Sequence, residues 1–191
     1  MDDLPRYAAW GHQGARSGFE VLFLDRIDGG CRFEGYSAAV EDGEPWAVRY
    51  ALLVDEDWTT ERIEVTGHSA ESHGSLVLEH DGSGHWRLDG ETAGDLEGCM
   101  DVDLEASAFT NALPIHRLNL AVSQAANARA AWVRARDLRV EPLDQSYARV
   151  ADEGRLERYD YSAPALDFSA QLAYDRHGLV VNYPGLSTRV I

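Results

Sequence analysis

A regular alternation of apolar and polar residues is the feature that most constrains how this chain folds. It is clearest in residues 166–175, where apolar residues recur at every second position and Ala173 is the one interruption. The same pattern recurs in residues 100–105, 117–122, 63–65, 76–78 and 86–88. Because successive side chains of a strand point to opposite faces, this period predicts strands that are buried on one face.

Glycine-containing turn motifs separate these segments. Glycine supplies the positive φ that tight hairpins require, so each motif predicts a hairpin. The motifs are Asp28-Gly29-Gly30, Asp42-Gly43, Asp81-Gly82-Ser83-Gly84 and Asp89-Gly90. Strands at intervals of about ten residues with such turns predict a mainly β fold, a single-domain antiparallel β-roll or open barrel with little helix over residues 1–191. We expect strand to exceed helix at least about twofold.

The alanine-rich segment 121–135 is the main exception, since alanine has the highest helix propensity. Residues 131–136 nevertheless alternate, with Trp132 and two arginines at every second position. We therefore expect a hairpin in this segment rather than a helix.

The charge of the chain limits its partners. The sequence holds 33 acidic and 17 basic residues, a net charge of −16, and every basic residue is arginine. An acidic field repels phosphate backbones, which disfavours nucleic acid as a partner. No apolar run approaches the roughly 18 residues of a transmembrane segment. The acidic N-terminus does not resemble a signal peptide, so we expect a cytoplasmic protein with Cys31 and Cys99 reduced.

Histidines gather in the first half of the chain. His68, His73, His80 and His85 lie close together, with Asp81 nearby, and imidazole with carboxylate is a donor set that suits zinc. Turn residues separate the members of each pair, so we interpret them as surface loop histidines. The sequence predicts no metal site and no other cofactor.

Asp101 and Asp103 occupy alternate positions of an expected strand. Residues i and i+2 share a face with about 6.6 Å between their Cα atoms, near the separations of glycosidase carboxylates. Any D-x-D strand has this spacing, however, and a solvated or arginine-paired face is the more general interpretation. No strong catalytic motif is found, so no catalytic residue is predicted.

Residues 107–120 connect this strand to the next segment. Thr110 and Asn111 can bond local backbone, and Pro114 favours an extended conformation at Leu113. Two interpretations of Arg117 remain open. It neutralises Asp101 or Asp103 from an adjoining strand, or it places a polar group at the mouth of an apolar cavity.

Several segments resemble the putative glycolipid-binding family of bacterial proteins. The most specific segment is residues 110–118, TNALPIHRL, where the family's pattern has threonine in place of Ala112 and arginine in place of His116. The other matching segments are Tyr50, 58–60, 98–99, 101–104, 131–134, Gln145-x-Tyr147, Tyr159-x-Tyr161, 178–180 and 183–185. The resemblance covers residues 10–189. It implies one β-rich roll, similar to lipoprotein carrier folds, that binds a glycolipid.

The leading hypothesis is non-catalytic binding of a lipid or glycolipid in an apolar cavity of the roll, with the oligomeric state left open. Ligand sites are concave and mostly apolar with a few placed polar groups. The residues predicted to contact the ligand are Asp101, Asp103, Asn111, Arg117, Trp132, Arg134, Tyr147 and Tyr183.

Two alternatives remain. The first is an enzyme, a hydrolase or isomerase acting on a lipid- or sugar-linked substrate in the same cavity. A strongly shifted pKa of a carboxylate or histidine inside the cavity would favour it. The second is an interaction module, which would show a filled interior and an exposed apolar patch.

Overall fold

The computed structural model describes residues 4–191 and is dominated by two β-sheets. Strand accounts for 59% of the described residues and helix for 9%, which confirms the predicted excess of strand. The strands are β1 (Tyr7–His12), β2 (Arg16–Ile27), β3 (Gly30–Glu41), β4 (Glu44–Asp55), β5 (Thr60–Ser69), β6 (His73–His80), β7 (Trp86–Leu88), β8 (Glu91–Thr92), β9 (Asp101–Leu104), β10 (Ala125–Asn127), β11 (Ala130–Val133), β12 (Val140–Leu143), β13 (Ser146–Glu153), β14 (Leu156–Ala163), β15 (Phe168–Tyr174), β16 (Val180–Tyr183) and β17 (Ser187–Arg189). The helices are α1 (Ala112–Leu118) and the 3-10 turns η1 (Gly94–Leu96), η2 (Phe109–Asn111) and η3 (Pro164–Leu166).

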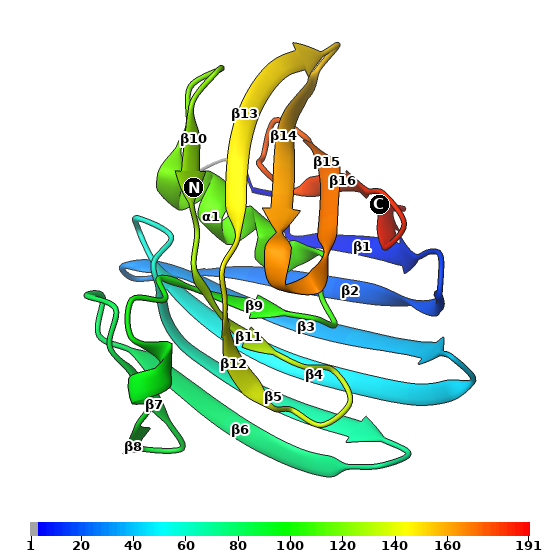
Figure 1. Ribbon diagram of the computed structural model, residues 1–191, viewed down its shortest axis with the longest axis vertical. Coiled ribbons are helices and arrows are strands. Elements are labelled where there is room, and N and C mark those ends of the chain that lie inside the picture. The colour runs from blue at the N-terminus through cyan, green and yellow to red at the C-terminus, as the bar shows by residue number, and fades with distance from the viewer. Residues whose placement is uncertain (1–3) are drawn as a thin grey trace.

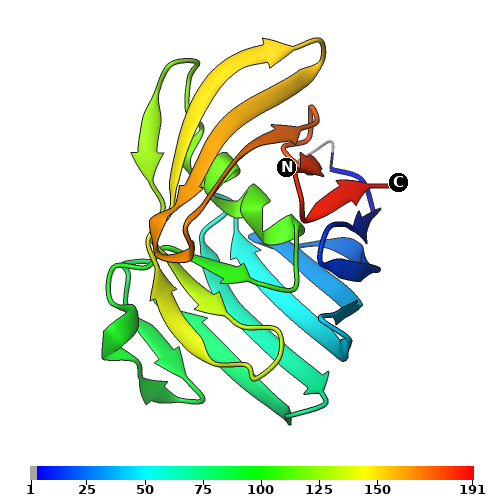
Figure 2. The ribbon, with the colours of Figure 1, turned by 45° about the vertical axis from the view of Figure 1, so that its right-hand side comes forward.

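The larger sheet has 14 strands in the order β10-β13-β14-β15-β16-β17-β1-β2-β3-β4-β5-β6-β7-β8. β1 pairs antiparallel with both β2 and β17. These two pairings connect the N-terminal half of the sheet, β1–β8, to its C-terminal half, which consists of β10 and β13–β17. The sheet is curved but not closed into a barrel. Figures 1 and 2 show its two halves inclined to one another, with α1 and the smaller sheet on the inner side.

All four glycine motifs form the expected hairpin turns, between β2 and β3, β3 and β4, β6 and β7, and β7 and β8. Asp42 and Gly43 both have positive φ, 54° and 82°, as the tightest hairpin turn requires at its two central positions. Alternation in β3 and β4 buries every second side chain against the inner layer. The period-two segments predicted in this half, residues 63–65, 76–78 and 86–88, lie in β5, β6 and β7 and are confirmed as strands.

The smaller sheet has the order β12-β11-β9 and lies against the inner face of the larger one. β9 and β11 are parallel, with Trp132 opposite Asp103. Val102 and Leu104 of β9 are buried in the main apolar core, together with Leu52 and Ile63 of the larger sheet. The acidic side chains of β9 consequently face the other way, toward the C-terminal half.

Segment 107–120 does not become a loop entering a strand, as the sequence predicted. It forms η2 and then α1, and α1 ends at Asn119 in the left-handed conformation with φ 43°. Pro114 lies in the first turn of α1, where the missing N–H of proline is tolerated, so Leu113 is helical. Arg117 therefore projects from a helix.

Segment 121–135 is neither a helix nor a hairpin. β10 pairs with β13, whereas β11 pairs with β9 and β12. The alternation correctly indicated extended backbone, but the partners of both strands lie outside the segment. The hairpin prediction is wrong because local alternation does not specify which strand is the neighbour.

His68, His73 and His80 lie on strands, whereas His85 lies in the exposed loop before β7, as the surface interpretation predicted. His68 and His73 are exposed cross-strand neighbours with ring centroids 4.0 Å apart. His80 is buried and stacks on Trp86. Its Nδ1 donates to the Thr60 carbonyl and its Nε2 accepts from the Gly84 N–H. The surface interpretation is thus wrong for His80, whose two ring nitrogens already have partners.

Two further sequence predictions concern the cysteines and membrane-spanning segments. Cys31 and Cys99 are both buried and are not joined to each other by a disulfide. Within residues 4–191, no helix is both long enough and apolar enough to span a membrane.

Candidate functional site

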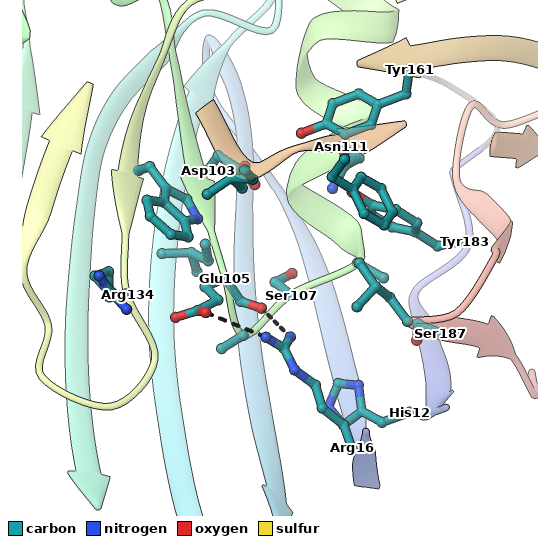
Figure 3. Close-up of a pocket in the computed structure, with 17 residues that line it drawn as sticks. His12, Arg16, Asp103, Glu105, Ser107, Asn111, Arg134, Tyr161, Tyr183 and Ser187 are labelled. Carbon is teal, nitrogen blue, oxygen red and sulfur yellow. Dashed lines mark hydrogen bonds and ion pairs between the residues drawn. The ribbon is translucent and has the colours of Figure 1, made fainter. Parts of the chain in front are cut away.

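A cavity of about 330 Å³ opens on the inner side of the curved sheet. It is lined from both halves of the larger sheet and from β9, β11 and the β9–α1 connection. Figure 3 shows its polar side chains converging from these elements. The lining residues are His12, Arg16, Asp103, Leu104, Glu105, Ala106, Ser107, Ala108, Asn111, Trp132, Arg134, Tyr161, Leu166, Phe168, Tyr183, Leu186 and Ser187.

A row of three acids follows one face of β9 and its end. Asp101, Asp103 and Glu105 alternate with the buried Val102 and Leu104, so their side chains share the face directed at the cavity side. The outer two acids are each held by an arginine. The central acid is not.

Asp101 forms a two-pronged ion pair with Arg117. Arg117 Nε lies 2.9 Å from Asp101 Oδ1, and Nη2 lies 2.6 Å from Oδ2. The Asp101 side chain is only 2% exposed and that of Arg117 17%. The hydrogen bonds to Asp101 raise the pKa of Arg117. This pair matches the first of the two interpretations of Arg117, with a helix in place of the expected strand.

Glu105 is held at the other end of the row. It accepts a 2.8 Å hydrogen bond from the Ala135 N–H, and Arg16 Nη2 lies 3.5 Å from its carboxylate. Arg16 also donates to the Glu105 carbonyl and pairs with Glu41 at 2.9 Å. Figure 3 shows Arg16 reaching Glu105 across the lower part of the cavity. The charge of Arg16 is therefore shared between two acids.

Asp103 occupies the middle of the row and contacts neutral groups. Its Oδ1 accepts from Thr110 Oγ1 at 2.9 Å, and its Oδ2 accepts from Gln145 Nε2 at 2.6 Å. The pKa of Asp103 is raised to about 6, mainly by burial and to a smaller extent by the nearby Glu105 and Asp101 carboxylates, while the hydrogen bonds from Thr110 and Gln145 lower it. Asp103 can thus exchange a proton near neutral pH.

Aromatic rings form the wall of the cavity beside Asp103. Tyr161, Phe168 and Tyr183 pack as a triangle with ring centroids 5.8–6.1 Å apart. Burial and the Asp103 charge raise the pKa of both tyrosines, so their hydroxyls stay protonated and can donate hydrogen bonds. Trp132, on the strand paired with β9, carries the Arg134 guanidinium over its ring at 5.4 Å.

The remaining polar lining residues have partners within the fold. Asn111 accepts a 2.9 Å hydrogen bond from the Tyr147 hydroxyl. His12 Nε2 lies 3.0 Å from Ser37 Oγ, and burial lowers the pKa of His12 to about 4. His12 is consequently neutral at pH 7.

Glu20 fixes the segment that carries Ser107 and Asn111. It is fully buried and accepts hydrogen bonds from the Tyr50 hydroxyl at 2.7 Å, the Ser107 hydroxyl and the Ala108 N–H at 2.8 Å. Burial raises the pKa of Glu20. The Tyr50 ring reaches this position across Gly35, where a Cβ would lie 2.0 Å from the ring. These contacts hold the start of η2 against β2.

Five of the eight predicted ligand-binding residues line the cavity: Asp103, Asn111, Trp132, Arg134 and Tyr183. Tyr147 lies behind Asn111 as its hydrogen-bond partner, and Asp101 and Arg117 are paired with each other outside the lining. The ion pair of Asp101 agrees with the arginine-paired face that the sequence favoured over a glycosidase-like pair of carboxylates.

Sequence reasoning missed several lining residues, among them Arg16, Glu105 and Tyr161. Glu105 continues the alternation of Asp101 and Asp103, so that pattern could have identified it. Glu20 was also missed, although a charged residue inside the apolar run 19–24 was a usable signal. Arg16 meets Glu105 through contacts between distant segments, which no local pattern records.

An apolar patch lies on the outer face of β1–β3. Its exposed members are Tyr7, Phe19, Phe23, Tyr36 and Val40. Such a patch is one feature expected of an interaction module. The filled interior expected with it is replaced here by the cavity.

Comparisons with known proteins identify relatives of this chain. The family model described as "Putative glycolipid-binding" matches residues 7–189. A crystal structure of a DUF1089 family protein from Pseudomonas aeruginosa is 33% identical, with a TM-score of 0.76, and the match covers 90% of this chain and 92% of that one. A β-barrel-like protein of the domain of unknown function DUF1849 from Brucella abortus is 9% identical, with a TM-score of 0.57 over 96% and 94% of the two chains. The second likeness is one of fold alone. No curated protein sequence matches the chain.

Proposed function

We propose that this chain, which belongs to the putative glycolipid-binding family, holds the headgroup of a lipid or glycolipid in the cavity beside Asp103. The observation that carries the proposal is the combination of a partly buried carboxylate, held by neutral donors, with an aromatic wall. Carboxylates accept hydrogen bonds from sugar hydroxyls, and flat rings cover the apolar faces of sugars.

The size and mouth of the cavity support a headgroup rather than a whole lipid. Its volume of about 330 Å³ is near the lower end of the range of roughly 300–1,000 Å³ for ligand pockets. Leu166 and Leu186 line it, and Leu166 is 45% exposed. An acyl chain leaving the cavity would cover these side chains.

Native mass spectrometry of the purified protein tests this proposal. We expect a co-purified lipid, or uptake of an added alkyl glycoside, with one ligand per chain. Asp103→Asn should weaken uptake, because an amide is a poorer acceptor and adds a donor. The control is Asp144→Asn, which makes the same charge change at a side chain that is 83% exposed. Absence of both a co-purified lipid and glycoside uptake in the wild type would overturn the proposal.

A second candidate function rests on the pKa of Asp103. A partly buried carboxylate with a pKa raised to about 6 suits a general acid or base, which is the property that favours an enzyme in this cavity. Under this candidate, Asp103 exchanges a proton with the bound substrate in a hydrolase or isomerase. Incubating the bound ligand with the wild type and with Asp103→Asn separates the two: a changed ligand mass or isomer with the wild type only supports catalysis, and an unchanged ligand supports binding.

A further inference from the structure

Asp103 differs from its two neighbours in having no cation among its contacts in the described chain. Arg117 holds Asp101, and Arg16 lies at Glu105, whereas Asp103 has the hydroxyl of Thr110 and the amide of Gln145. We propose that the bound headgroup carries a primary ammonium group, as an amino sugar does, and that this group pairs with Asp103. This inference rests on the proposed function.

The charges around Asp103 favour a cation at this place. Asp101 and Glu105 face the same side of β9, and their arginines are already engaged. The tyrosines facing Asp103 from β13–β16 stay neutral at pH 7, since the pKa of each is raised, and His12 is neutral because its pKa is lowered. These tyrosines are Tyr147, Tyr161, Tyr174 and Tyr183. A partly buried carboxylate without a cation carries a desolvation cost, and a ligand ammonium offsets that cost.

The geometry of Asp103 favours an ammonium with hydrogens over a quaternary one. An ionised carboxylate has about four acceptor positions. Thr110 and Gln145 occupy one on each oxygen, so acceptor positions remain for N–H donors from a ligand. A primary ammonium carries three such donors.

The aromatic lining adds a second attraction for a cation. Tyr161 and Tyr183 lie beside Asp103, and Trp132 is opposite it in the β9–β11 register. The negative faces of such rings attract cations. One face of Trp132 already binds a cation, since the Arg134 guanidinium lies 5.4 Å from its ring centroid. Arg16 and Arg134 also line the cavity, but each is paired with acids of the fold, Arg16 with Glu41 and Glu105 and Arg134 with Glu141.

Calorimetric titration with two matched probes tests the inference. The probes are an alkyl glucoside and the alkyl 2-amino-2-deoxyglucoside of the same chain length, each kept below its micelle concentration at pH 7. We expect the amino glycoside to bind the wild type at least about tenfold more tightly, which is about 1.4 kcal/mol. The Asp103→Asn variant should bind both probes equally, and Asp144→Asn should keep the preference.

A pH series on the wild type gives a readout that does not depend on the variant folding. As the pH falls from 7 to 5, Asp103 gains a proton and the preference for the amino glycoside should fall. Equal affinities at pH 7, or a preference that survives in folded Asp103→Asn, would overturn the ammonium pairing while leaving the proposed function standing. If neither probe binds the wild type, the proposed function and this inference both fail.

Discussion

Replacing Arg117 by alanine tests whether the ion pair at the end of the acidic row has a structural or a ligand-binding role. The substitution removes both hydrogen bonds to Asp101, at 2.9 and 2.6 Å, and leaves a carboxylate with a 2% exposed side chain. Arg117 does not line the cavity, so we expect a loss of stability and no direct loss of ligand contacts.

The magnitude follows from how deeply the pair is buried. Breaking a buried ion pair by removing one partner costs about 3–5 kcal/mol, whereas an exposed pair contributes about 0–1 kcal/mol. Asp101 is buried but Arg117 is 17% exposed, which places the loss at the lower end, about 3 kcal/mol. Arg117→Lys should recover only part of this loss, because an ammonium cannot reproduce the two parallel bonds of the guanidinium.

Urea unfolding followed by tryptophan fluorescence measures this difference. The matched control is Arg139→Ala, which removes a 3.6 Å pair with Glu141 from a side chain that is 67% exposed, and it should change the free energy of unfolding by no more than about 1 kcal/mol. The double variant Asp101→Leu with Arg117→Met should be more stable than Arg117→Ala, since no charge is left buried. The reasoning is refuted if Arg117→Ala unfolds at the same urea concentration as the wild type, and still more clearly if it does so while losing bound lipid.

Two further substitutions test other contacts around the cavity. Tyr50→Phe removes one donor from buried Glu20 and should lower the free energy of unfolding by about 1–3 kcal/mol in the same urea assay; an unchanged midpoint would show that Glu20 does not need this hydroxyl. His116 stacks on Trp58 with ring centroids 3.6 Å apart, and burial lowers the pKa of His116 from 6.5 to about 4. As the pH falls, His116 therefore binds a proton in the unfolded chain before it does so in the folded protein. The contribution of His116 to the free energy of unfolding is complete above pH 6.5 and is lost as the pH falls toward 4. Relative to His116→Phe, the wild type should lose stability over that interval, and parallel pH profiles of the two proteins would contradict this.

The fold was predictable to the extent that its determinants are local. Alternation and Asp-Gly turns are properties of neighbouring residues, and they correctly indicated the mainly β class and the hairpins of β2–β4. α1 was not predictable in this way, because its start depends on Glu20, whose carboxylate accepts from Ser107 and Ala108 across 87 and 88 positions of sequence. Likewise, nothing within residues 121–135 shows that β10 and β11 join different sheets.

The candidate site was likewise predictable only in part. Of the residues predicted from the sequence to contact a ligand, the structure brings Asp103, Asn111, Trp132, Arg134 and Tyr183 to one cavity and leaves the other three outside its lining. The sequence did not indicate which acids of β9 would be neutralised by an arginine. That choice depends on where two arginines lie after folding, one on α1 and one on β2.

The three acids of the row have nearly the same chemistry, but the positions of the two arginines give each acid a different electrostatic environment. Arg117 neutralises Asp101 and ties α1 to β9, and Arg16 joins Glu105 to Glu41 of β3. Both contacts link separate elements around the cavity. Asp103 lies between them, with one neutral partner from η2 and one from the segment between β12 and β13. The fold therefore leaves at Asp103 a negative charge that its own side chains do not balance, and this is the property that a ligand in the cavity would meet.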